Sequence, residues 1–232
     1  MRIKAYPKIN LCLKVFKETD CGKHKIDSIF YLYKQICDKI KITKNSNLSI
    51  SYKLENEVLN FDDCLVTKSM IYMHNKYGID VNYKIVIKKN IPLGCGFGGG
   101  SSDAAAIINF LIKKNPNLNI KLDLKEIAAT LGSDIPFFLT GYQTARVTSI
   151  GDNVCKSVCL KPQIEVLIPK LKCETKKIFD LLSQDNNYQS LVNVDQILES
   201  YIYKQHLNNV VYNDLTKYII QKITTYYTYY NL

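Results

Sequence analysis

The residues best suited to chemistry lie at positions 92–103, which hold half of the ten glycines of this 232-residue chain. Glycine has no Cβ and adopts positive φ angles, so consecutive N–H groups can turn inward around an anion. Alternating apolar residues at 83–88 predict a strand before the run, and the pattern at 101–111 predicts a helix after it. Strand, glycine loop and helix together predict a phosphate-binding site, with the positive end of the helix dipole facing the loop. Three side chains are expected to cap the first turn of that helix: Ser101, Ser102 and Asp103.

Other glycine loops fit this segment less well. The P-loop requires Lys and then Ser or Thr after its second glycine, whereas Gly99 is followed by Gly100 and Ser101. Gly94, Gly96 and Gly99 match the dinucleotide fingerprint, but so many glycines produce such a match by chance, and no clear first βαβ unit surrounds it. The protein-kinase signatures His-Arg-Asp and Asp-Phe-Gly do not occur in the chain. A flexible linker is disfavoured because both flanks are strongly patterned.

The segment from Pro92 to Ala105 resembles the ATP loop of the GHMP kinases, a family of small-molecule kinases. Its triple glycine before Ser-Ser-Asp-Ala-Ala is similar to that of one branch, the 4-diphosphocytidyl-2-C-methyl-D-erythritol kinases of the non-mevalonate isoprenoid pathway. The resemblance runs from about Ile3 to Leu215, through three further segments in the family's order. It implies an ATP site made of Pro92, Leu93, Gly94, Cys95, Gly96, Phe97, Gly98, Gly99, Gly100, Ser101 and Ser102.

The first further segment is the predicted strand from Ala5 to Val15, which is similar to the family's opening strand. Strict alternation would place Lys8, Asn10 and Cys12 on the face opposite the apolar residues. By pattern alone Lys8 would be a solvated strand residue, the usual place of lysine. The resemblance instead implies that Lys8 is the catalytic lysine and that Asn10 contacts the substrate.

The second segment, 131–139, resembles the family's Gly-Ser-Asp-Val-Pro-Phe motif and contains Asp134. A capping box from Asp123 to Glu126 predicts a helix that ends at Gly132, so Asp134 follows in a turn. Taken alone it would be an ordinary turn aspartate. The resemblance implies a general base that accepts the proton of the attacking hydroxyl, oriented by Lys8. It also implies Mg²⁺ bridging the phosphates of ATP, with Ser102 as the candidate protein ligand.

The third segment concerns the acceptor that is phosphorylated. Residues 20–26 take the place of the family's Asp-Gly-Tyr-His, keeping His24 but replacing the tyrosine by Lys23. The resemblance implies that His24 contacts a cytosine edge, and that Thr175 and Phe179 contact the substrate from a helix on which they share one face. By pattern alone His24 is a loop histidine, Thr175 a helix cap and Phe179 a core residue. The Lys23 departure leaves other GHMP acceptors open, namely homoserine, mevalonate or a sugar.

The composition suits a compact enzyme, but it leaves open a second class of protein that has no catalytic activity. The net charge of +10 would also fit a nucleic-acid-binding protein without catalysis. The 31 basic residues are nearly all lysines, with only Arg2 and Arg146 as arginines, and they are dispersed along the chain. A nucleic-acid partner is therefore disfavoured. We expect a small-molecule substrate, a cytidine diphosphate derivative, and a monomer or homodimer.

Targeting and redox signals are weak. No apolar run approaches the ~18 residues that cross a bilayer, and the N-terminus lacks the apolar core of a signal peptide. The eight cysteines are scattered and form no zinc set, so they are expected to be reduced. These features predict a cytoplasmic protein without a membrane partner.

The resemblance implies an α+β, two-domain GHMP kinase fold. Residues 1–151 would form an N-terminal α/β domain like the second domain of ribosomal protein S5, and 152–232 a ferredoxin-like α+β domain that starts with a strand at 164–168. The family's Ser-Gly-Ser-Gly segment is missing after Leu215, and the chain ends in a tyrosine-rich run at 226–230. We therefore expect a shortened second domain with an open sheet edge and compromised activity. The tail either replaces the lost strand or leaves a non-functional product.

Overall fold

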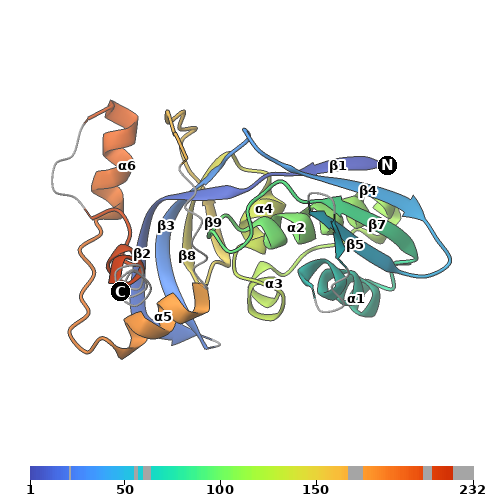
Figure 1. Cartoon of the computed structure of the whole chain (residues 1–232), viewed down its shortest axis with the longest axis horizontal. Coiled ribbons are helices and arrows are strands. Elements are labelled where there is room, and N and C mark those ends of the chain that lie inside the picture. The colour runs from blue at the N-terminus through green and yellow to red at the C-terminus, as the bar shows by residue number, and fades with distance from the viewer. Residues whose placement is uncertain (21, 55–56, 60–63, 167–174, 206–210, 222–232) are drawn as a thin grey trace.

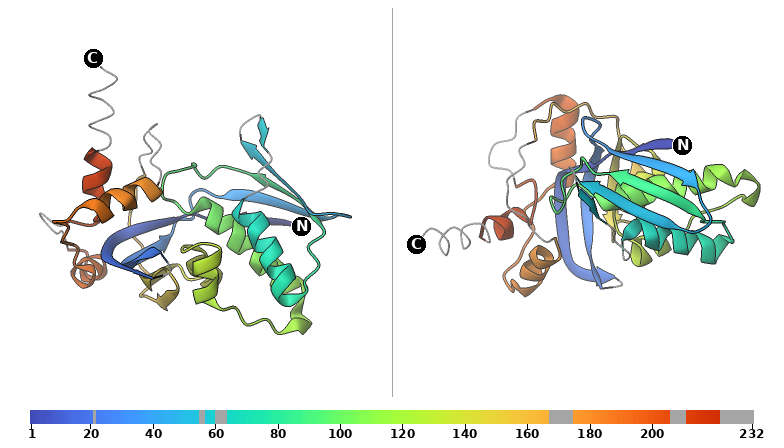
Figure 2. Two further views of the ribbon diagram at one scale, coloured as in Figure 1. Left: turned by 90° about the horizontal axis from the view of Figure 1, so that it is seen from below. Right: turned by 45° about the vertical axis from the view of Figure 1, so that its right-hand side comes forward.

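A computed structural model describes the chain except for residues 21, 55–56, 60–63, 167–174, 206–210 and 222–232. The tyrosine-rich run at 226–230 therefore lies outside the described residues. Two sheets stand side by side, with helices packed against each of them (Figures 1 and 2). The predicted α+β class is confirmed by this mixture of sheets and helices.

The first sheet has five strands in the order β1-β4-β7-β5-β6. Its strands are antiparallel except for the parallel pair of β5 with β7. Their bounds are β1 (Arg2–Ala5), β4 (Asp38–Lys44), β5 (Ser49–Leu54), β6 (Glu57–Leu59) and β7 (Tyr83–Lys88).

The second sheet is antiparallel, with four strands in the order β2-β3-β8-β9. Its strands are β2 (Lys8–Asp20), β3 (Lys23–Leu32), β8 (Thr144–Ser149) and β9 (Asn153–Lys156). The chain passes from the first sheet to the second between Ala5 and Lys8. At the outer edge of β2, Leu13 N donates to Tyr212 O over 2.7 Å, and Asp214 N donates to Leu13 O over 3.0 Å. The C-terminal segment thus covers part of this edge.

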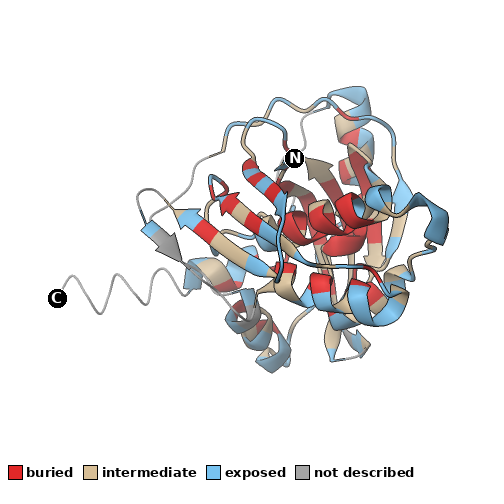
Figure 3. Ribbon diagram, turned by 90° about the vertical axis from the view of Figure 1, so that its right-hand side faces the viewer, coloured by how far each residue is buried: buried red, intermediate tan, exposed pale blue. Residues whose placement is uncertain are grey.

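Helices bury the apolar side chains of both sheets, as the buried residues in Figure 3 show. The bounds are α1 (Leu65–Tyr77), α2 (Gly99–Lys114), a 3₁₀ turn η1 (Pro116–Leu118), α3 (Leu124–Thr130), α4 (Ile135–Thr140), α5 (Thr175–Gln184) and α6 (Val194–Tyr203). Helices α1 to α4 contribute to the core of the first sheet, while α5 and α6 pack on strands of the second. Helix α4 belongs to both layers, since Ile135 lies in the first core and Phe137 packs on Phe30 of β3.

Local sequence patterns account for the elements next to the glycine loop. Ile85 and Ile87 are buried and alternate with the less buried Lys84, Val86 and Lys88 along β7, which coincides with the predicted strand. The predicted helix after the loop is confirmed as α2. The capping box is confirmed on one side, because Asp123 Oδ1 accepts from Glu126 N over 3.0 Å and α3 begins there.

Two predictions about strands are wrong. The register of β2 shifts between Asn10 and Cys12, so strict alternation fails and Cys12 is fully buried beside Leu11. Burial raises the pKa of its thiol to about 11. Residues 164–166 of the expected strand at 164–168 are irregular, and the remainder lies outside the described residues.

In its described part, the segment after position 152 does not form a sheet of its own. Strand β9 pairs with β8, and the helices that follow pack on β2 and β3. The domain boundary at 151/152 stays a prediction. No described helix is long and apolar enough to cross a membrane. The cysteines whose positions are described are free thiols, as predicted: Cys12, Cys37, Cys64, Cys95, Cys155 and Cys159.

We predict that Gly151→Ala destabilises the fold strongly. The φ angle of Gly151 is 101°, and a Cβ there would lie 2.2 Å from Ser133 O, a backbone atom that cannot move without displacing its turn. We expect a loss of about 3 kcal/mol or more in the free energy of unfolding, measured by urea denaturation. Gly141→Ala is the matched control: φ is 71° but nothing lies within 4 Å, so only about 1–2 kcal/mol should be lost. Equal losses would show that the contact with Ser133 does not matter.

Candidate active site

The glycine loop is shaped by backbone conformation rather than by packing. Gly94, Gly96 and Gly98 have φ angles of 71°, 72° and 65°, which residues with a side chain rarely adopt. At Gly94 and Gly96 an added Cβ would meet nothing within 4 Å, so it is their backbone that calls for glycine. Gly98 is the N-cap of α2, and the loop therefore leads directly into the positive end of that helix.

The expectation that Ser101, Ser102 and Asp103 cap α2 is wrong, because no side chain of the described chain caps it. Ser102 Oγ donates to Tyr6 O over 2.6 Å, and Asp103 pairs with Lys89 instead. Both side chains therefore make contacts that hold α2 in place instead of capping it. The first-turn N–H groups consequently keep no capping side chain and can bind an anion.

Lys8 is buried rather than solvated. It opens β2 and is only 5% exposed. Its Nζ lies 3.7 Å from Asp134 Oδ2, donates to Asn10 Oδ1 over 3.0 Å, and stands 4.7 Å from the centre of the Phe30 ring. A buried ammonium is costly unless it is paired, so these contacts hold a fixed positive charge beside Asp134.

Asp134 lies in the turn between α3 and α4 and faces the glycine loop. Its side chain remains 29% exposed. An added Cβ on Gly98 would lie 3.0 Å from Asp134 Oδ2, and Lys8 N donates to Phe97 O over 3.0 Å. The structure thus brings together three segments that were predicted separately: the loop, Lys8 and Asp134.

This arrangement can support phosphoryl transfer to a hydroxyl. A glycine loop at a helix N-terminus holds phosphate, a partly exposed carboxylate accepts a proton, and a buried cation between them stabilises negative charge. Such transfer depends chiefly on positioning and electrostatics, with little covalent work for the protein.

His24 and Phe179, which the sequence predicted for one substrate, are also brought together. Their rings stack with centroids 5.7 Å apart and planes 20° apart. His24 Nδ1 lies 2.8 Å from Phe16 O, and because a carbonyl only accepts, Nδ1 carries a proton. His24 Nε2 lies 2.7 Å from Ser183 Oγ, a contact that sequence reasoning missed because only the fold places α5 here. Thr175 is exposed one turn before Phe179.

Lys23, which replaces the family's tyrosine, is used structurally. Its Nζ donates to Ala129 O over 3.0 Å and also to Ala128 O. These carbonyls lie in the last turn of α3, where a cation complements the negative end of the helix dipole. Lys23 therefore ties the β2–β3 hairpin to the helix that leads into Asp134, and it offers no ring for stacking.

The two clusters lie at different positions along one strand. Phe30, beneath Lys8, pairs with Asn10, whereas His24 pairs with Thr19 near the far end of the hairpin. From His24 to Phe30 the strand rises roughly 20 Å at about 3.3 Å per residue. A ligand that touched both clusters would have to be elongated.

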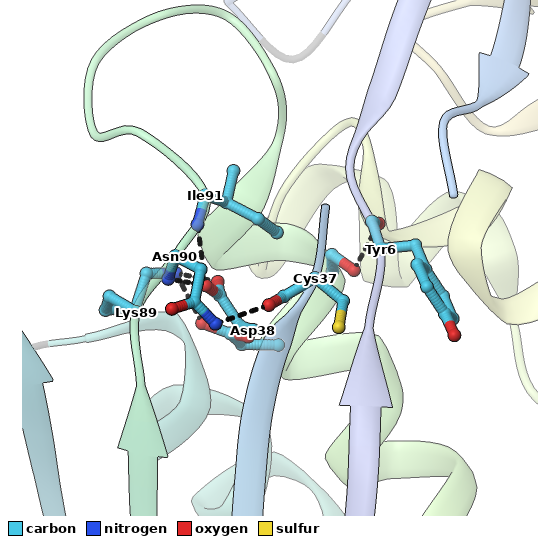
Figure 4. A network of polar contacts seen from close by, with 8 residues as sticks. Tyr6, Cys37, Asp38, Lys89, Asn90 and Ile91 are labelled. Carbon is cyan, nitrogen blue, oxygen red and sulfur yellow. Dashed lines mark hydrogen bonds and ion pairs between the residues drawn. The ribbon is translucent and has the colours of Figure 1, made fainter. Parts of the chain in front are cut away.

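A further set of buried charges adjoins the loop, and no sequence pattern predicts it. Asp38, Lys89 and Asp103 are all buried and form one network. Figure 4 shows Asp38 and Lys89 in contact. Burial raises the pKa of Asp103 to about 7. Burial alone would lower the pKa of Lys89, but the charges of Asp103 and Asp38 raise it above its usual value.

One hollow of about 370 Å³ lies away from these groups, where β2, β3 and β8 meet residues 190–195. Its Arg146 is already held by Asp27 over 2.7 Å and by Asp195 over 2.6 Å. None of the residues predicted from the sequence to bind ATP or substrate lines it.

Known proteins match this chain over most of its length. Residues 64–142 match the family described as GHMP kinases N terminal domain. The 4-diphosphocytidyl-2-C-methyl-D-erythritol kinase of Ureaplasma parvum serovar 3 is 34% identical over 227 residues, which are 95% of this chain and 83% of that protein. The chain belongs to this family of GHMP kinases. The enzyme of the same name from Campylobacter jejuni strain RM1221 is 30% identical over 236 residues, covering 97% and 90% of the two chains.

Solved structures agree on the fold. A crystal structure of 4-(cytidine 5'-diphospho)-2C-methyl-D-erythritol kinase superposes with a TM-score of 0.70 at 24% identity, over 97% of this chain and 79% of that one. A mevalonate diphosphate decarboxylase from Legionella pneumophila gives 0.55 at 13% identity, over 88% and 71%. The predicted GHMP kinase fold is confirmed.

As a member of this family the chain is a kinase, an ATP-dependent phosphotransferase that acts on an alcohol group. This decides against the alternative of a nucleic-acid-binding protein without catalysis. The roles of individual site residues stay predictions.

We predict that Gly98→Ala lowers turnover at saturating substrates at least about ten-fold more than Gly96→Ala does. Both positions have left-handed φ angles and share that strain, but only at Gly98 does the new Cβ crowd Asp134 Oδ2 and Phe138. Small displacements of reacting groups cost large factors in rate. Equal turnover numbers for the two variants, measured by ADP release, would mean that the loop does not position Asp134.

Proposed function

We propose that this kinase transfers the γ-phosphoryl group of ATP to the 2-hydroxyl of 4-diphosphocytidyl-2-C-methyl-D-erythritol, a step of the non-mevalonate isoprenoid pathway. The observation that carries the proposal is the buried Lys8 facing Asp134 beside the glycine loop. The names of the relatives supply the acceptor. The runner-up is another acceptor of the GHMP kinases, such as mevalonate, homoserine or a sugar, because Lys23 removes one aromatic contact.

In this proposal Asp134 accepts the proton of the acceptor hydroxyl as its oxygen attacks the γ-phosphorus. The bond from the γ-phosphorus to the oxygen that bridges the β- and γ-phosphates breaks, and ADP leaves. Lys8 stands 3.7 Å from Asp134 Oδ2, so its charge orients the carboxylate and offsets negative charge on the reacting oxygens. Phe30 and Asn10 keep the ammonium in place.

The loop residues from Pro92 to Ser102 hold the phosphates of ATP. Left-handed glycines keep side chains out of the loop, and the uncapped first turn of α2 presents its N–H groups to the anion. Since phosphates are multiply charged, the helix dipole stabilises them further.

Mg²⁺ fits this site as a phosphate-bound ion. The described residues contain no group of three or more His, Cys, Asp or Glu side chains that could hold a metal by themselves. Mg²⁺ needs few protein ligands when phosphates and waters supply the rest. The buried hydroxyl of Ser102 donates to Tyr6 O, which leaves oxygen lone pairs for the ion. When bound, Mg²⁺ would neutralise phosphate charge.

Acceptor recognition is proposed to use both ends of the β2–β3 hairpin. Asn10 Oδ1 accepts from Lys8, so its amide Nδ2 is the group left to contact the acceptor near the reacting hydroxyl. The stacked His24 and Phe179 would contact the cytosine, with Thr175 one turn away on α5. The spacing along β3 suits a nucleotide joined through a diphosphate to the polyol. We also propose a cytoplasmic location and a monomer or homodimer.

We predict a clear preference for the cytidyl acceptor. ADP release should be measured with 4-diphosphocytidyl-2-C-methyl-D-erythritol, mevalonate, homoserine and galactose as parallel acceptors. Binding groups at both ends of an elongated substrate should give it a kcat/KM at least about 10²-fold above the other three. A preference for mevalonate or homoserine would overturn the acceptor and leave the kinase assignment intact.

We predict that Asp134→Asn lowers kcat by about 10²–10⁴, the usual contribution of a positioned base. The KM for ATP should stay nearly unchanged, because the amide keeps the size of the carboxylate beside Gly98. Asp80→Asn is the control, since Asp80 is an exposed carboxylate paired with Lys44 and should leave turnover intact. Retained turnover in Asp134→Asn would remove this residue from the mechanism.

A further inference from the structure

Three buried charged residues surround the base of the glycine loop without belonging to the catalytic pair. Asp38 begins β4, and Lys89 follows directly after β7 (Figure 4). Asp103 lies in the first turns of α2. Lys89 is 7% exposed, and both aspartates are fully buried. Lys89 Nζ contacts a carboxylate oxygen of each aspartate.

Asp38 holds the segment that leads into the loop. Its Oδ1 accepts from Asn90 N over 2.6 Å and from Ile91 N over 2.8 Å, while its Oδ2 accepts from Lys89. Asn90 Nδ2 also donates to Cys37 O over 2.7 Å, so both the backbone and the side chain of Asn90 are held by the start of β4 and the residue before it. The backbone just before Pro92 is therefore fixed against β4.

Asp103 connects this point to the far end of the loop. Its Oδ2 accepts from Lys89 Nζ over 2.8 Å. An added Cβ on Gly99, the first residue of α2, would lie 3.5 Å from Lys89 Nζ and 3.0 Å from the side chain of Ile91. The start of the loop and the helix that follows it thus meet at one ammonium group.

Stability alone does not account for this network. Two buried carboxyl groups share one ammonium, so the triad holds one more acidic group than it has cations to pair with. Asp103 Oδ1 is buried and has no hydrogen-bond partner among the described residues. Buried ion pairs are often no more stabilising than apolar residues of similar volume. What such pairs do provide is a fixed geometry, and here that geometry joins the two ends of the loop.

We propose that Lys89 is a positioning residue for ATP: by holding Asp38 and Asp103 together, it fixes the start of the glycine loop relative to the N-terminus of α2. The N–H groups that meet the phosphates are divided between these two parts of the backbone. Their spacing is then set before ATP arrives, which lowers the ordering cost of binding. The inference rests on the proposed function, because its effect is on ATP.

The test removes the contact between Lys89 and Asp103 while leaving the Asp38–Lys89 pair intact. Asp103→Ala deletes the carboxylate that is in excess, and Asp103→Asn retains an oxygen that can accept from Lys89. ATP is titrated calorimetrically into the full-length chain in magnesium-containing buffer, and KM values for ATP and for the acceptor are measured alongside. Ser69→Ala is the matched control, because Ser69 Oγ is also buried without a partner but lies on α1.

We expect Asp103→Ala to raise the Kd and KM for ATP about ten-fold, the usual effect of losing a hydrogen bond to a charged group. The KM for the acceptor should stay within about two-fold. Asp103→Asn and Ser69→Ala should keep ATP affinity within about two-fold of the unaltered chain. If Asp103→Ala fails to fold, Asp103→Leu removes the same contact without leaving a cavity.

The outcomes separate this inference from the proposed function. Equal ATP affinity for Asp103→Ala and the unaltered chain would overturn the positioning role, and so would an equal rise in both KM values. Failure of Asp103→Asn to restore ATP affinity would overturn it as well. Failure of the unaltered chain to bind ATP would instead overturn the proposed function.

Discussion

The site depends on one crossing point, where the chain leaves the first sheet at Ala5 and enters the second at Lys8. Two hydrogen bonds attach the glycine loop there: Lys8 N to Phe97 O over 3.0 Å, and Ser102 Oγ to Tyr6 O over 2.6 Å. Without them the loop would be attached to the first sheet only. With them, the loop and α2 are also attached to one end of the second sheet, so a displacement of any one of the three displaces the others.

The same crossing explains why a lysine can be buried at the start of β2. Its ammonium lies against Phe30 and 3.7 Å from Oδ2 of Asp134, the residue directly before α4. Helix α4 packs into both cores, through Ile135 in one and Phe137 in the other. Asp134, directly before this helix, is therefore fixed relative to both sheets. Gly151 adds a close approach, since only a residue without Cβ leaves room for Ser133 O next to Asp134. The positions of Lys8, Asp134 and the glycine loop are therefore set by contacts between the two layers.

Features governed by nearest neighbours could be predicted from the sequence. The alternation of β7 and the capping of α3 by Asp123 are local, and both are confirmed. What failed depended on partners distant in the chain. The bulge in β2 arises from pairing with β3, and Ser102 leaves its helix cap because Tyr6 O is within reach. The Asp38–Lys89–Asp103 network gave no signal, because an aspartate before a strand and a lysine after another are ordinary surface patterns until the strands pair.

The acceptor end shows how recognition can change while the chemistry stays fixed. Lys23 directs its ammonium to the last carbonyls of α3, so the aromatic contact that the family places here is replaced by a structural tie. In the proposed function, discrimination would then fall on His24 and Phe179, whose rings stack on one another. Phe16 O and Ser183 Oγ hold the His24 ring. Along β3, His24 lies roughly 20 Å from Phe30, the residue against which the Lys8 ammonium packs. If the acceptor binds there as proposed, a substitution at the tip would alter its fit without disturbing the crossing that positions Lys8, Asp134 and the loop.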